Sequence, residues 1–271
     1  MFDPYLIISF LVLGAVVGFM AGLLGIGGGA ILVPMLTSIF LWQGVAIDNV
    51  VHLALGTSMA CIIFTSISSL RSHHKRGGVI WPIVQKMVPG VLIGTFLATF
   101  LATLVNSLYL ALFFAAFMAY VAFTMFTNKS EQSTKALGGN AALFGTGTFI
   151  GGISALVSIG GGSLTVPYLN GRQIEIKKAI GTSAAVGFPI AVAGTLGYVI
   201  NGWSNAITMG SSDSYILGFV HIPGVILISL ISMLTAPLGV KTAHKLPVNT
   251  LKKVFAILVL MISVKMVYSV L

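Results

Sequence analysis

The chain has 271 residues, of which 57% are hydrophobic and only 7% charged, and its mean hydropathy is +1.05. Soluble domains carry about 25% charged residues, so this composition excludes a soluble globular protein; with apolar runs of about 20 residues, it predicts an all-α protein that crosses a membrane several times. The net charge of +9 comes from 14 Lys and Arg against 5 Asp and Glu. Because these cations lie in short loops between the apolar runs, we interpret them as signals that orient the protein in the membrane. We expect no nucleic-acid partner.

The first apolar segment, 5–42, is too long for one bilayer crossing of about 20 residues. A glycine cluster, Gly25-Ile26-Gly27-Gly28-Gly29, interrupts it and is followed by Val33-Pro34. Each glycine inside a helix costs about 1 kcal/mol relative to alanine, so we expect the helix to break at the cluster. The break leaves a full span, 5–24, and about half a span, 30–41.

Seven more apolar segments follow in the chain. They are 50–70, 83–105, 107–127, 140–169, 178–201, 215–240 and 251–268. The segment 140–169 contains a second cluster, Ile159-Gly160-Gly161-Gly162, followed by Val166-Pro167. It lies 133 residues after the first cluster, and two such breaks at matching places favour a shared binding site.

Other matches indicate that the whole chain is an internal duplication. The stretch 54–60 corresponds to 179–185 at a spacing of 125, and Pro89-Gly90-Val91 corresponds to Pro223-Gly224-Val225 at a spacing of 134. The order of these elements is the same in both halves. We therefore predict one transmembrane transport domain, 1–271, built from two repeats, 5–127 and 139–270.

The basic loops distinguish parallel from inverted repeats. If every segment simply crosses, the loops 71–86 and 172–178 lie on opposite sides, against the positive-inside rule. If both glycine-broken segments return to the side they entered from, the N-terminus lies outside, and the loops 71–86, 129–135, 172–178 and 241–253 are all cytoplasmic. We therefore favour two inverted repeats, each with a glycine-broken re-entrant hairpin and three transmembrane helices.

The glycine clusters also suggest the chemistry of the site. A helix that restarts after a glycine turn presents unpaired N–H groups and a partial positive charge, which suit an anion. Hydroxyls that follow glycines in both repeats are able to donate to anion oxygens, although glycines also serve close helix packing and hydroxyls also bond between helices. The predicted substrate-binding residues are Gly27, Gly28, Gly29, Thr57, Ser58, Gly160, Gly161, Gly162, Thr182 and Ser183.

The few reactive side chains argue against an enzyme. The single cysteine, Cys61, excludes a disulfide, a CxxC pair and a cysteine metal cluster. No Asp or Glu lies at mid-span, so a carboxylate proton relay is absent, and we expect His52 and His221 to be interfacial. The Gly-rich string at 25–30 lacks a surrounding βαβ unit, which excludes dinucleotide binding. We expect no catalytic residues, no metal and no cofactor.

The paired elements from Gly25 to Pro34 and from Ser158 to Pro167, each followed by A-x-G-T-S and a P-G segment, resemble the TauE/SafE family of sulfite and organosulfonate exporters. The likeness covers about 11–260, and the second copy has Ser158 where the first has Gly25. The resemblance implies an inner-membrane (cytoplasmic-membrane) secondary transporter of bacteria or archaea for small sulfur-containing anions. It also implies that the motif glycines and hydroxyls named above form the site.

We accordingly expect export of a sulfonate, a sulfoacetate-like anion or sulfite by alternating access of the two halves. The inside-negative potential drives an anion outward at about 2.3 kcal/mol per charge per 100 mV, so little ion coupling is required. The alternatives are an ion-coupled uptake transporter, a passive anion channel, and a membrane redox or assembly protein, which needs paired cysteines or facing histidines. The expected partners are the anion and the lipid bilayer; a coupling ion (H⁺ or Na⁺) and the oligomeric state are left open.

Overall fold

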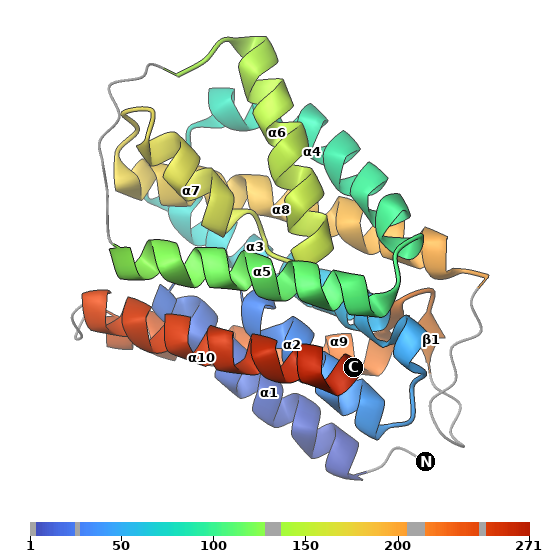
Figure 1. Ribbon diagram of the computed structural model, residues 1–271. Coiled ribbons are helices and arrows are strands. Elements are labelled where there is room, and N and C mark those ends of the chain that lie inside the picture. Colours follow the sequence, from blue (N-terminus) through green and yellow to red (C-terminus); the bar gives the residue numbers. More distant parts are fainter. Residues whose placement is uncertain (1–3, 25–27, 128–136, 205–214, 244–247) are drawn as a thin grey trace.

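The computed structural model describes residues 4–24, 28–127, 137–204, 215–243 and 248–271, and these are almost entirely helical (Figure 1). In chain order the elements are α1 (Pro4–Leu24), α2 (Gly29–Trp42), α3 (Ile47–Lys75), α4 (Trp81–Thr103), α5 (Ser107–Thr127), α6 (Asn140–Val157), α7 (Gly162–Asn170), α8 (Ile176–Gly202), β1 (Ile216–Leu217), β2 (Val220–His221), α9 (Ile222–Ala243) and α10 (Val248–Val270). Within the described ranges, seven helices are long and apolar enough to cross a membrane. The protein is therefore an all-α, multi-pass membrane protein.

Both predicted breaks are present. The first segment divides into α1 and α2, and the segment 140–169 divides into α6 and α7. With 9 residues, α7 is about 14 Å long and cannot cross a hydrocarbon core of about 30 Å. The 14 residues of α2 reach about 21 Å.

The chain reverses direction at each break. Phe10, early in α1, packs against Phe40, late in α2, with ring centroids 6.4 Å apart. At the second break, a Cβ atom on Gly138, just before α6, would lie 3.8 Å from Nη1 of Arg172, just after α7. Each broken segment therefore brings its two ends close together.

The predicted helix over 215–240 begins later than expected. Residues 216–221 form a short antiparallel β-hairpin, and α9 starts only at Ile222. Gly218 lies in the turn of this hairpin with a φ of +58°. The Phe219 N–H donates a hydrogen bond of ordinary length, 3.1 Å, to the carbonyl of Tyr198. The apolar sequence alone does not reveal this turn, because its partner Tyr198 lies on α8.

The two halves are intertwined. The first helix of each half packs on a late helix of the other half, α1 on α9 and α6 on α4, and Figure 1 shows α4 and α6 side by side. Glycines make these contacts close: a Cβ atom on Gly14 would lie 2.8 Å from the Ile228 carbonyl oxygen, and Gly147 abuts the carbonyl of Met87.

These contacts align α4 with α9 at a different spacing from the 134 residues that separate Pro89-Gly90-Val91 from Pro223-Gly224-Val225. Gly14 and Gly147 are 133 residues apart, whereas their partners Met87 and Ile228 are 141 apart. At that spacing Pro223 corresponds to Pro82, and each proline is the second residue of its helix, where a missing N–H costs little.

At the centre, α3 packs against α8, its equivalent in the other half. The contacts run in opposite directions along the two helices: Gly56 faces Tyr198, and a Cβ atom on Gly194 would lie 3.1 Å from Sδ of Met59. The two helices are therefore antiparallel. The equivalents α5 and α10 also lie side by side (Figure 1).

Candidate functional site

Gly28 and Gly161 occupy equivalent positions and cap α2 and α7 with the same backbone conformation. Their φ angles are 66° and 76°, in the left-handed region that glycine adopts most easily. Neither helix has a side-chain cap at this end. The first amides of α2 and α7 therefore have no side-chain acceptor, which is the arrangement that suits an anion.

The structure brings the two breaks together. Gly29 lies against the carbonyl oxygen of Ser158, in the other break. Ile62 of α3 lies beside both: Cβ atoms on Gly29 and Gly160 would be 3.1 Å and 3.2 Å from its side chain. The predicted glycines 28, 29 and 160–162 thus belong to one region, whereas Gly27 lies outside the described residues.

Thr57 and Thr182 connect the two halves. The side-chain oxygen of Thr57 accepts a hydrogen bond from the backbone N–H of His221, and that of Thr182 accepts one from the N–H of Ile80, each at 3.0 Å. His221 and Ile80 immediately precede α9 and α4. Each threonine oxygen therefore bonds between helices by accepting one hydrogen bond. Its own O–H proton is not used in that bond and can still be donated.

Ser58 and Ser183 are buried next to the breaks. Ser58 lies one helical turn before Ile62, and Ser183 one turn before Gly187, whose backbone abuts the carbonyl of Gly160. Residues one turn apart share a helix face, so both serines point toward the broken segments. The Ser58 hydroxyl is buried without a hydrogen-bond partner, which makes it a donor available to a ligand.

Five further hydroxyls in α6, in α7 or at the break between them were not predicted as site residues. The buried side-chain oxygens without a hydrogen-bond partner in this region belong to Ser154, Ser158, Ser163, Thr165 and Tyr168. A buried hydroxyl is costly unless it is bonded, so these groups need a polar ligand or water. The duplication does not reveal them, because their equivalents in the first repeat are not hydroxyl residues.

Both histidines that we expect at the membrane interface are buried inside the protein. His52 and His221 are only 4% and 2% exposed. The His52 Nε2 atom lies 2.9 Å from the Ala102 carbonyl oxygen, and the Gly224 N–H donates to Nδ1 of His221 at 3.0 Å. Backbone partners let the polar rings be buried. Among the described residues, no three His, Cys, Asp or Glu side chains are grouped closely enough to hold a metal ion.

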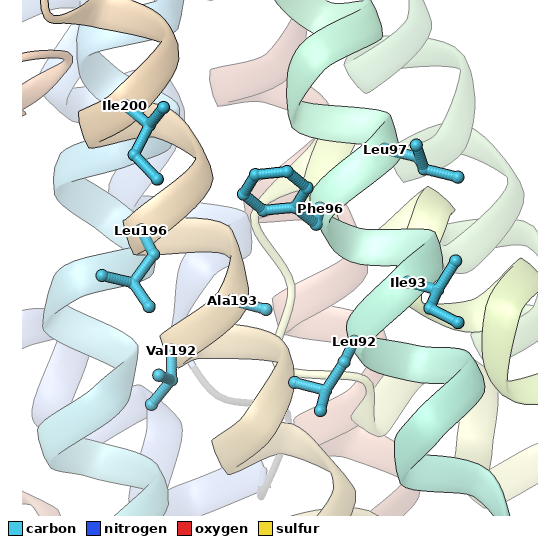
Figure 2. Close-up of a pocket in the computed structure, with 8 residues that line it drawn as sticks. All are labelled: Leu92, Ile93, Phe96, Leu97, Val192, Ala193, Leu196 and Ile200. Atoms are coloured by element: carbon cyan, nitrogen blue, oxygen red, sulfur yellow. The ribbon is translucent and has the colours of Figure 1, made fainter.

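An apolar groove of about 550 Å³ lies between α4 and α8, away from the breaks (Figure 2). Its lining residues are Leu92, Ile93, Phe96, Leu97, Val192, Ala193, Leu196 and Ile200. None of these side chains is polar, so the groove offers nothing to hold an anion.

Comparisons with known proteins give a consistent result. The sequence model of the family described as "Sulfite exporter TauE/SafE" matches residues 10–266. A probable membrane transporter protein of Haemophilus influenzae is 36% identical over 258 residues, which cover 94% of this chain and 96% of that protein. Probable membrane transporter proteins of Methanocaldococcus jannaschii and Bacillus subtilis are each 26% identical, over 87% and 71% of this chain and 86% and 78% of their own lengths. No solved structure matches the chain significantly.

Proposed function

Because the chain belongs to the TauE/SafE family of sulfite exporters, we propose that this membrane transporter carries small sulfur-containing anions, such as sulfite or a sulfonate, out of the cell by alternating access. The mechanism uses binding and movement and requires no catalytic residue. The substrate reaches the protein from the cytoplasm and leaves on the outer side of the inner membrane.

The contact between the two glycine breaks is the observation that carries this proposal. Gly29, the first residue of α2, meets Ser158 at the end of α6, and Gly160, two residues before α7, lies beside the same Ile62 side chain, so the starts of α2 and α7 belong to one region. Each end adds about half a positive charge from its helix dipole, and glycine leaves the amides accessible. Together with Ser58 and Ser183 they form a neutral donor site for an anion, and Thr57 and Thr182 hold that site in position.

Alternating access requires two halves that exchange roles, and the antiparallel packing of α3 on α8 supports an inverted relation between them. Two equivalent helices that run in opposite directions are related by an axis in the plane of the membrane. Each hairpin then enters the membrane from the opposite side. The short α7 supports a re-entrant segment because it is less than half a membrane in length.

The arrangement of the helix ends supports cytoplasmic basic loops and an external N-terminus. In Figure 1 the C-terminal ends of α5 and α7 and the first turns of α8 and α10 lie at the left-hand end of the molecule. These ends flank the basic loops 129–135, 172–178 and 241–253. The positive-inside rule assigns that end to the cytoplasm.

A binding panel on the purified protein tests the substrate class. Sulfite, sulfate, thiosulfate, methanesulfonate, taurine and acetate are each added while the melting temperature is measured, since a ligand that binds only the folded state raises it. We expect sulfite or a sulfonate to raise the melting temperature and acetate to leave it unchanged. Protection by acetate without protection by any sulfur oxyanion would contradict the proposal.

A flux measurement in proteoliposomes tests the mechanism. An anion trapped inside should leave faster when an inside-negative potential is imposed, and counterflow should occur when unlabelled anion is present on the other side. A carrier shows counterflow, whereas a passive channel does not. A strict requirement for an inward Na⁺ or H⁺ gradient would instead favour coupled uptake.

A further inference from the structure

We propose that the second break adds side-chain donors to the site: the hydroxyls of Ser158, Ser163 and Thr165 hold the oxygen atoms of the anion, so that the substrate binds off-centre between two otherwise similar breaks. This inference rests on the proposed anion transport and specifies how the anion is held. The ligand class is an oxyanion with several acceptor oxygens on one head, such as sulfite or a sulfonate.

The first line of evidence is that these hydroxyls are buried without a partner at the site itself. Ser158 and Thr165 are fully buried, and the oxygen of Ser163 is inaccessible to solvent. A Cβ atom on Gly161, the residue that caps α7, would lie 3.5 Å from Oγ1 of Thr165. Ser158 is the residue whose carbonyl meets Gly29 of the other break.

Ordinary helix packing does not explain these free donors. Elsewhere in the described chain, hydroxyls such as those of Thr37, Thr146 and Thr195 donate to the carbonyl one turn earlier in their own helix, at 2.7–2.9 Å. Thr165 has the same kind of local neighbour, the Gly161 carbonyl, which accepts from the N–H groups of Leu164 and Thr165, but its hydroxyl makes no hydrogen bond to it. The hydroxyls at the break are therefore free to donate to a ligand.

The second line of evidence is the difference between the repeats. At the spacing of 133, the hydroxyl residues at 154, 158, 163 and 165 correspond to Ala21, Gly25, Ala30 and Leu32. The first break therefore offers backbone amides but no side-chain donors at these positions. An anion that needs hydroxyl donors is bound more tightly on the side of the second break.

Neutral hydroxyls suit a transported anion. Each one donates a single hydrogen bond to an anionic oxygen without adding a fixed charge that would hold the substrate permanently. Three donors together with the amides of α7 match a head group with three oxygens better than a carboxylate with two.

The test converts each donor position to its first-repeat counterpart or to an isostere. Ser158→Gly suits the left-handed φ of 48° at that residue, Ser163→Ala copies Ala30, and Thr165→Val keeps the side-chain shape. The matched control is Ser263→Ala on α10, another buried hydroxyl without a partner but in a helix that carries no break. The dissociation constants for sulfite and methanesulfonate are measured by calorimetry, and the KM for efflux is measured in proteoliposomes.

We expect each of the three variants to raise the dissociation constant for sulfite about tenfold or more, because a hydrogen bond to a charged group contributes about 1.5–3 kcal/mol. Ser263→Ala should bind sulfite as the wild type does. The ligand-free melting temperature of Thr165→Val should match that of the wild type, so that a weakened affinity reflects a lost donor.

If wild-type protein binds and transports sulfite while all three variants bind it equally well, the inference is overturned and the proposed function stands. If wild-type protein binds neither sulfite nor methanesulfonate, both fail. An effect of Ser263→Ala as large as that of Thr165→Val would also overturn the inference, because it would show a general response to losing a buried hydroxyl.

Discussion

At the scale of single residues, Thr57 and Thr182 show how two halves of a chain are held in register by one oxygen each. The backbone N–H groups of His221 and Ile80 lie at the starts of α9 and α4, where no intrahelical acceptor exists. A threonine from the other half supplies the acceptor in both cases. The same arrangement, a threonine oxygen that accepts from the N–H before a helix of the other half, therefore occurs twice, each time at 3.0 Å.

Replacing these acceptors should destabilise the protein and slow transport. Thr57→Val and Thr182→Val keep the side-chain shape but leave an amide without its partner; the cost is about 1–3 kcal/mol for the buried amide of His221 and smaller for the half-buried amide of Ile80. We expect a lower melting temperature and a reduced efflux rate for each variant. Thr57→Ser and Thr182→Ser retain the oxygen and should restore both. Wild-type melting temperatures in both valine variants would show that these bonds contribute nothing.

At the scale of helices, the close contact between α4 and α6 depends on particular glycines. A Cβ atom on Gly151 would lie 2.5 Å from the Val91 carbonyl oxygen and 2.8 Å from Oγ1 of Thr95. The next residue, Gly152, has room: its nearest neighbours would be 3.7 Å and 3.9 Å away. Two adjacent glycines on one helix therefore have different roles.

Alanine at these two positions separates packing from helix propensity. Gly151→Ala forces α4 and α6 apart and should lower the melting temperature. Gly152→Ala should leave it unchanged or raise it, because alanine is the better helix former by about 1 kcal/mol. Thermal unfolding of both purified variants checks this. Equal melting temperatures for the two would contradict the packing described for α6.

The helical elements were largely predictable, and the exceptions have a common cause. Apolar length and glycine clusters locate the spans and both breaks, since they depend on local composition. The β-hairpin before α9 and the burial of His52 and His221 were not predicted. Each depends on residues far away in the sequence: Phe219 bonds to Tyr198, His52 lies beside the Ala102 carbonyl, and the His221 ring packs against Phe10 and Phe40.

At the scale of the whole molecule, the candidate site illustrates the same limit. The duplication predicts the glycines and Ser58 as site residues, because a repeated motif is visible in one sequence. It did not identify Ser163 or Thr165, which differ between the repeats, and it did not show that Gly29 meets Ser158. Those facts require the fold, because they depend on which segments of the two halves become neighbours.

The proposed opposite orientation of the two halves leads to a final prediction about topology. Ala46 and Glu175 immediately precede the equivalent helices α3 and α8, and both are exposed. With two re-entrant hairpins, Ala46 lies outside the cell and Glu175 inside; with plain crossings, both lie on the same side. In a Cys61→Ala background, which removes the only native cysteine, we expect a membrane-impermeant maleimide to label Ala46→Cys in right-side-out vesicles and Glu175→Cys only in inside-out vesicles. Labelling of both from one side would mean that the halves are parallel, and the N-terminal ends of α2 and α7 would then not face each other from opposite sides of the membrane.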